Sequence, residues 1–177
     1  MNKELYYRLT IGAGFGSGYP LQEENDGISV TGEFAIQREK NVYALGLRSV
    51  IEFDLFSTSY PNNSISSIDI TYGKVLINGK FFSSVSAGIG FIEGITRGKY
   101  LSSGGPGWFD PDYYEKIRFY RIGIPISAKM FWVPLRFYGI GLELYVNINI
   151  KNTFYGIIFC HQFGKLSPKK LKMIPTN

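Results

Sequence analysis

A strict alternation of apolar and polar residues constrains this chain more than any other feature of its sequence. Successive side chains of a β-strand point to opposite faces, so a period of two residues indicates strands, whereas an amphipathic helix repeats about every 3.6 residues. The alternation recurs in eight segments, and no convincing helix separates any two of them. The segments are 7–16, 28–37, 42–56, 68–77, 80–95, 114–132, 138–149 and 153–164. We therefore predict an all-β protein with eight antiparallel strands.

The connections between these segments alternate in length. Long polar loops are expected at 17–27, 57–67 and 96–113, and short turns at 38–41, 78–79, 133–135 and 151–152. In an up-and-down barrel, alternate connections lie at opposite ends, so long loops gather at one rim and short turns at the other. Only the last turn, which belongs to the long-loop rim, departs from this rule. A change of phase after Tyr72 also predicts a bulge near Gly73 in the fourth strand.

Alternation alone leaves open which face of the barrel meets water. A soluble carrier barrel turns its apolar face inward around a ligand, whereas a membrane barrel turns that face to lipid. Here the polar face is rich in Gly, Ser, Thr and Asn, which suits an eight-stranded interior that is barely wide enough for its own side chains. Aromatic residues near strand ends, such as Tyr43, Phe53 and Tyr155, are typical of girdles at the two membrane interfaces. We therefore predict a transmembrane barrel.

The charged residues on the polar face carry both signs. An unpaired charge in a narrow interior is too costly, so we expect these side chains to pair with one another in the lumen. Glu143 is expected to pair with Arg121 or Lys129 on the neighbouring strand, in a structural rather than a catalytic arrangement. The predicted lumen charge network consists of Arg8, Glu33, Arg48, Glu52, Asp54, Asp69, Arg121, Lys129 and Glu143.

Three strands carry a resemblance to a known family. They are the glycine-rich first strand LTIGAGFGSGY, the sixth strand YRIGIPISAKMFW and the following YGIGLELYVNI. The chain resembles, from Leu5 to Leu166, the small outer-membrane β-barrel domains of the OmpA-like and porin-like superfamily. The resemblance implies an eight-stranded up-and-down transmembrane β-barrel over 1–166, a basic periplasmic tail over 167–177, and a place in the bacterial outer membrane among its lipids. In this family the last strand typically ends in an aromatic residue, which Phe163 matches.

The two ends of the barrel suggest different partners. The loop at 96–113 holds Trp108, Phe109, Tyr113 and Tyr114, which are predicted to contact an external partner, a glycan or a lipid headgroup, or to fold down onto the rim. Lys165, Lys169, Lys170 and Lys172 make the tail basic, and a tail of this kind is usually solvated, so we expect no nucleic-acid partner.

Few residues suggest chemistry. The lone histidine, His161, is the only candidate base for a lipid A-modifying enzyme, and no serine stands with it in a recognisable motif. The glycine string Gly12, Gly14, Gly16 and Gly18 lacks the Lys-Ser/Thr and the following helix of a phosphate loop. One cysteine and one histidine exclude an internal disulfide and a multi-histidine metal site, and we expect no cofactor.

The sequence therefore predicts a non-enzymatic outer-membrane barrel with a structural, adhesion or envelope-integrity role and no wide pore. Two alternatives stay open, namely a soluble β-barrel that binds an apolar ligand and a lipid A-modifying enzyme. The first residues are polar and show no signal peptide, so we expect the chain to be a mature form or a truncated product.

Overall fold

The computed structural model describes residues 5–20, 25–53, 59–105 and 112–166 of the 177. Its strands are β1 (Leu5–Pro20), β2 (Asn25–Arg38), β3 (Asn41–Glu52), β4 (Ser59–Tyr60), β5 (Ser64–Asn78), β6 (Phe81–Ser103), β7 (Asp112–Leu135), β8 (Tyr138–Ile148) and β9 (Asn152–Gly164). Each predicted segment lies within or overlaps one of these strands. No helix in the described ranges is long and apolar enough to cross a membrane.

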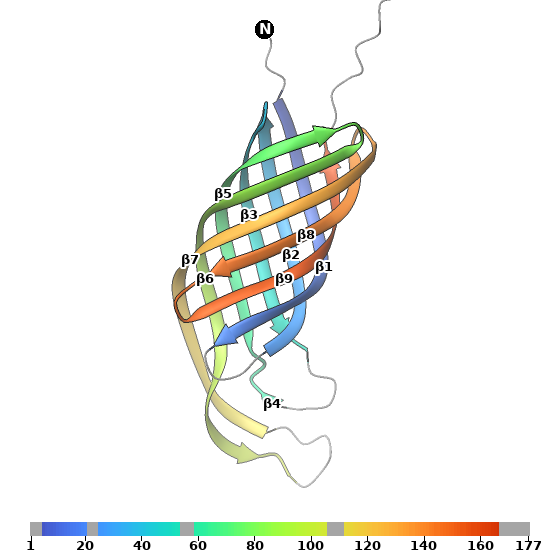
Figure 1. The fold of residues 1–177 in the computed structure, drawn as a ribbon. Coiled ribbons are helices and arrows are strands. Elements are labelled where there is room, and N and C mark those ends of the chain that lie inside the picture. The colour runs from blue at the N-terminus through green and yellow to red at the C-terminus, as the bar shows by residue number, and fades with distance from the viewer. Residues whose placement is uncertain (1–4, 21–24, 54–58, 106–111, 167–177) are drawn as a thin grey trace, which may run out of the picture.

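Eight of the strands form a closed antiparallel ring (Figure 1). Each long strand pairs with the next along the chain, and β9 pairs back with β1 from Arg8↔Gly164 to Pro20↔Asn152. Because the ring is closed, it leaves no unpaired sheet edge along the wall. The predicted eight-stranded up-and-down barrel is confirmed. The short strand β4 lies outside the ring and pairs in parallel with residues 112–113 of β7.

The two rims differ in the way the sequence predicts, but most of the described residues of the predicted loop at 96–113 form β-strand. Pairing of β5 with β6 ends at Ser64↔Ile95 and pairing of β7 with β8 ends at Ile148↔Ile124, yet β6 and β7 continue together to Ser103↔Asp112. They form a two-stranded ribbon that projects beyond the barrel (Figure 1). We call residues 96–103 and 112–122 the external ribbon, although residues 118–122 pair with 91–95 of β6 and so still border the barrel wall. The prediction of a loop over 96–113 is therefore wrong for most of its length.

Two smaller predictions also need correction. The β5–β6 turn consists of Gly79 and Lys80, because Asn78 pairs with Phe81, and Gly79 supplies the positive φ of 60° that this turn requires. No bulge occurs at Gly73: β5 keeps one register with both neighbours, and Val75 points into the lumen. The apolar Val75 therefore signals an interior contact rather than a change of face.

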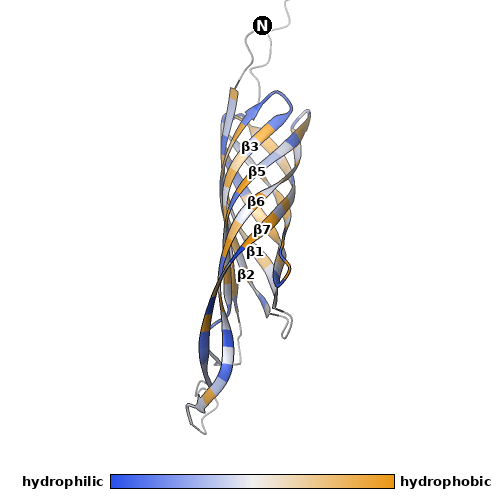
Figure 2. Ribbon diagram, turned by 90° about the vertical axis from the view of Figure 1, so that its left-hand side faces the viewer, coloured by the Kyte–Doolittle hydropathy of each residue, from blue (hydrophilic) through white to orange (hydrophobic). Residues whose placement is uncertain are grey.

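The outer wall of the barrel is a continuous apolar surface. Side chains midway along the strands are largely exposed, including Leu47 (57%), Ile70 (70%) and Ile89 (70%). Figure 2 shows hydrophobic residues recurring along the strands of the barrel wall. An exposed apolar surface of this extent on a soluble monomer would be exceptional. The apolar face therefore points outward, as predicted for a membrane barrel.

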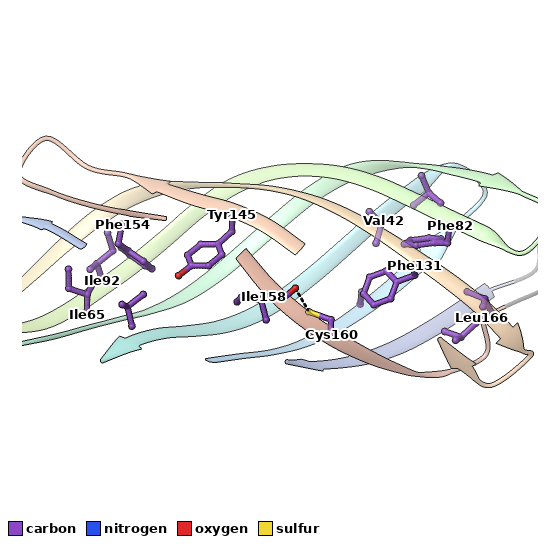
Figure 3. Close-up of a cluster of buried hydrophobic side chains, with 14 of the residues drawn as sticks. Val42, Ile65, Phe82, Ile92, Phe131, Tyr145, Phe154, Ile158, Cys160 and Leu166 are labelled. Atoms are coloured by element: carbon purple, nitrogen blue, oxygen red, sulfur yellow. Dashed lines mark hydrogen bonds between the residues drawn. The ribbon is translucent and has the colours of Figure 1, made fainter. Parts of the chain in front are cut away.

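Apolar side chains also pack inside the lumen, in layers at its two ends (Figure 3). Ile65, Ile92 and Phe154 lie toward the long-loop rim. Phe82 and Phe131 lie toward the opposite rim, with ring centroids 6.0 Å apart. These layers separate the polar middle of the lumen from both openings.

Glycines make room for one bulky interior side chain, Tyr145. Its hydroxyl lies 2.8 Å from the Oγ of Ser29 across the lumen. A Cβ on Gly16 would lie 2.8 Å from the Tyr145 hydroxyl, and a Cβ on Gly156 would lie 2.8 Å from Tyr145 Cε1. The inward glycines that the sequence places on the first strand therefore have a packing role.

We predict that Gly156→Val destabilises the barrel by about 1–3 kcal/mol, because overpacking forces neighbouring side chains and backbone to shift. The new Cβ would also lie 2.5 Å from the Phe15 carbonyl oxygen. The matched control is Gly32→Val, since a Cβ at Gly32 meets no heavy atom within 4 Å. Urea unfolding in detergent micelles measures both variants, and equal midpoints for the two would refute this packing role.

Candidate functional site

Five charged side chains meet in the middle of the lumen. The Arg48 guanidinium donates to Asp69 Oδ2 (Nη1–O 2.6 Å) and to Glu143 Oε1 (Nη2–O 2.6 Å), and its Nη2 lies 3.5 Å from Glu33 Oε2. Lys129 Nζ contacts Glu33 Oε2 and lies 3.6 Å from Glu143 Oε1. All five side chains are buried. We call Glu33, Arg48, Asp69, Lys129 and Glu143 the lumen network.

The lumen network joins strands from opposite sides of the barrel. Glu33, Arg48 and Asp69 come from the adjacent strands β2, β3 and β5, and Lys129 and Glu143 come from β7 and β8. Neighbouring polar groups complete it: Ser67 Oγ donates to Asp69 Oδ2 at 3.0 Å and Asn147 Nδ2 to Asp69 Oδ1 at 3.3 Å. Buried charges are tolerated only when they are paired and hydrogen-bonded in this way. These ion-paired side chains occupy the middle of the lumen, where a channel would need open space.

Arg8 lies in the lumen but outside this cluster. Its guanidinium carbon is 4.0 Å from the centroid of the Phe82 ring, a cation–π contact. Within the described residues, its Nε and Nη2 have no hydrogen-bond partner. With Arg8 included, the buried side chains comprise three cations and three carboxylates, so the interior is electrically balanced.

Two small cavities lie among the described residues of the lumen. A cavity of about 10 Å³ lies beside Arg8 and Phe82, and one of about 20 Å³ lies near Ile65 and Phe119. A single water molecule needs about 10–15 Å³ of such volume. Neither cavity can hold an apolar ligand, so the lumen does not fit the soluble-carrier alternative.

Two further predicted members of the charge network, Glu52 and Arg121, lie outside the cluster. Glu52 is at the long-loop rim, where Arg97 Nη2 donates to its Oε2 at 2.5 Å. Arg121 is exposed, and the prediction is wrong for it because β8 ends at Ile148, opposite Ile124, so no strand covers β7 at that level. Its Nη1 donates to the Tyr120 carbonyl instead. Asp54 lies outside the described residues.

A hydrogen-bonded cluster holds the external ribbon against the barrel rim. Arg97 joins Glu52 through its guanidinium, and its Nε donates to the Pro61 carbonyl at 3.1 Å. Asn63 bridges the same groups: its backbone N–H donates to Glu52 Oε2, and its Oδ1 accepts from the Arg97 N–H. Arg97 is not predicted from the sequence, because it lies in a segment without clear alternation.

The predicted loop contacts divide into two groups. Tyr113 and Tyr114 lie on the ribbon, where the Tyr60–Tyr113 ring centroids are 6.3 Å apart and the Tyr100–Tyr114 centroids 5.5 Å apart. These tyrosines therefore pack onto the ribbon and β4, although Tyr113 stays 41% exposed. Trp108 and Phe109 lie outside the described residues.

His161 lies on the outer wall near the short-turn rim. Its Nδ1 is 2.8 Å from the Tyr138 hydroxyl, and the Phe159 ring packs against it with centroids 5.2 Å apart. In the part of the chain that the structure describes, no serine hydroxyl is hydrogen-bonded to this histidine. These contacts are those of an aromatic girdle at a membrane interface.

Comparison with known proteins gives the same architecture. No protein-family model matches the chain, and no curated protein matches it by sequence. Among solved structures, Neisserial surface protein A matches with a TM-score of 0.66 at 7% identity, covering 89% of this chain and 96% of that one. Ail, the attachment invasion locus protein of Yersinia pestis, in complex with the heparin analogue sucrose octasulfate, matches with a TM-score of 0.59 at 11% identity, covering 91% and 98%. The chain has the fold of these small outer-membrane β-barrel proteins.

Proposed function

We propose that this protein is an integral outer-membrane barrel with a structural or adhesive role, without a wide pore and without catalytic activity. One observation carries the proposal: the wall is apolar outside, while the lumen is closed by paired charges. In lipid, every backbone polar group must be satisfied internally, and a closed barrel does this. The absence of an enzymatic role is supported by the aromatic setting of His161 and by the use of the lumen carboxylates in ion pairs.

Planar-bilayer recordings test the absence of a pore. Because the lumen network and the apolar layers at both ends fill the barrel, we expect the purified protein to give no conductance steps of porin size. The control is Phe131→Ala with Phe82→Ala, which removes the two rings packed at one end of the lumen. Porin-sized steps from the parent protein would contradict the proposal.

We further propose that the external ribbon binds a polyanionic surface ligand. The ribbon carries exposed Lys99, Lys116, Arg118 and Arg121. Lys116 pairs with Arg97, and Arg118 pairs with Ile95. Because the two cations are two residues apart on one strand, they point to the same face of β7, about 7 Å apart. That spacing lets two sulfate or phosphate groups bind side by side. The structure of Ail with a heparin analogue supports this choice of ligand class.

Sucrose octasulfate is the probe for this ligand class. Charge reversal in Lys116→Glu with Arg118→Glu should weaken its binding about tenfold or more, since each reversed charge replaces attraction by repulsion. Isothermal titration of the detergent-solubilised protein measures the affinity. The matched control reverses Lys40 and Lys80 on the opposite rim, and equal weakening by both double variants would point to net charge rather than to the ribbon.

A further inference from the structure

The short-turn rim carries a concentration of positive charge with almost no carboxylates among its described residues. Among the described residues of this rim, six exposed cations face a single exposed anion, Glu39. Among the described residues of the long-loop rim, by contrast, six cations face five carboxylates. The cations of the short-turn rim are Arg38, Lys40, Lys74, Lys80, Arg136 and Lys165.

These cations lie just beyond aromatic residues of the outer wall. Lys74 Nζ is 5.6 Å from the centroid of the Tyr72 ring, and both Lys74 and the Tyr72 hydroxyl donate to Asn41 Oδ1, at 2.5 and 2.9 Å. The Tyr72 ring is 5.2 Å from that of Tyr43. Lysines whose stems follow apolar surface while their ammonium groups reach outward are typical of side chains at a membrane interface.

Trp132 marks one position on this boundary. It is 44% exposed on the outer wall, and it pairs with Phe81, the residue after Lys80. The Lys80 carbonyl accepts a hydrogen bond from Val133 at 2.8 Å, so Lys80 lies next to Trp132. Arg136 begins the turn that follows β7. The indole therefore lies at the apolar edge of a short cationic stretch.

We propose that the short-turn rim binds acidic phospholipid headgroups, with Lys80 and Arg136 forming one such site around Trp132. This inference rests on the proposed membrane placement, in which short turns face the periplasm and the inner, phospholipid leaflet. A phosphodiester with net negative charge attracts clustered Lys and Arg beside a membrane, whereas a zwitterionic headgroup of net zero charge does so weakly. No described carboxylate forms an ion pair with Lys80 or Arg136, so both are available to a headgroup.

Tryptophan fluorescence quenching by brominated lipids tests the site. The sequence contains two tryptophans, so Trp108→Phe leaves Trp132 as the sole reporter. This full-length variant is reconstituted into vesicles containing brominated phosphatidylglycerol or brominated phosphatidylcholine. We expect the phosphatidylglycerol to associate with the Trp132 site about thirtyfold more strongly, the combined effect of two basic residues near an anionic headgroup.

The preference should fall to near unity in Lys80→Gln with Arg136→Gln and persist in the matched control, Lys116→Gln with Arg118→Gln on the external ribbon. Equal quenching by the two lipids in the parent, or a preference that survives loss of both rim cations, overturns the headgroup site while leaving the barrel in the bilayer. Absence of quenching by either lipid overturns the membrane placement and the site together. Gel mobility before and after boiling confirms that each variant is folded.

Discussion

Replacing Arg48 with methionine should destabilise the folded barrel by about 3–5 kcal/mol, the cost of removing one partner from a buried ion pair. Arg48 bridges three carboxylates that come from three other strands. Methionine fills a similar length but supplies no charge, so Asp69 would lose its cation and Glu143 would depend on Lys129 at 3.6 Å. We expect a large drop in the urea midpoint of the variant in detergent micelles.

Arg121→Met is the matched control for this prediction. Arg121 is exposed beyond the end of β8, so its loss should change the free energy of unfolding by less than about 0.5 kcal/mol. Adding Asp69→Asn to Arg48→Met should recover part of the lost stability, because it removes the carboxylate left without its cation. If Arg48→Met and Arg121→Met unfold at the same urea concentration, the lumen network does not brace the barrel.

Introducing a lysine at Ile70 should destabilise the barrel in lipid vesicles by about 2–4 kcal/mol, the cost of a cation facing the middle of a bilayer. Ile70 lies midway along β5 on the outer wall and is 70% exposed. In a water-facing position, the same substitution would cost almost nothing. The measurement is urea unfolding of the reconstituted protein.

Leu76→Lys provides the comparison on the same strand and face. Leu76 is 69% exposed, so exposure alone does not separate it from Ile70. It lies close to the short-turn rim, where a lysine can reach the headgroups and should cost about 0–1 kcal/mol. If lysine lowered the free energy of unfolding equally at both positions, the outer wall would not face a bilayer with an apolar centre. The membrane placement would then be wrong.

The alternation of residues was sufficient to predict the barrel because it is a local signal. A period of two marks the strands, and alternating connection lengths mark the two rims. Two predictions, the bulge near Gly73 and the loop at 96–113, are wrong because the alternation there does not separate a lipid-facing side from a lumen-facing side. At Gly73 the apolar Val75 belongs to an interior layer, so the sequence resembled a phase change. In residues 96–103 and 112–118, no side chain is fully buried in the barrel, so the ribbon strands lack the regular alternation of the wall.

The candidate site was harder to predict because it depends on depth along the barrel axis. The two-residue alternation of each strand correctly places five charged residues on the inward face, and the structure brings them together. They are Glu33, Arg48, Asp69, Lys129 and Glu143. Arg121 has the same position in the alternation, but it lies outside the lumen because β7 extends beyond the end of β8. That extension follows from pairing between strands that are distant in sequence, which a single strand's pattern does not contain.

The ion pairs that cross the lumen likewise could not be predicted from the pattern of any single strand. The expected partner of Glu143 was a residue of the neighbouring strand, and Lys129 does lie opposite it in the register. The nearer cation is Arg48, 2.6 Å away and on the far side of the ring in chain order. Arginine reaches across a narrow lumen and binds several carboxylates at once, because its planar guanidinium presents five donors.

The most direct test of a closed barrel with an apolar outer wall is the gel mobility of detergent-extracted protein, unboiled and boiled. We predict that the unboiled protein is found in the membrane fraction and migrates faster, as a compact barrel that detergent does not unfold, and that boiling shifts it to the mobility of the extended chain. A single mobility before and after boiling, with the protein in the soluble fraction without detergent, would contradict the account.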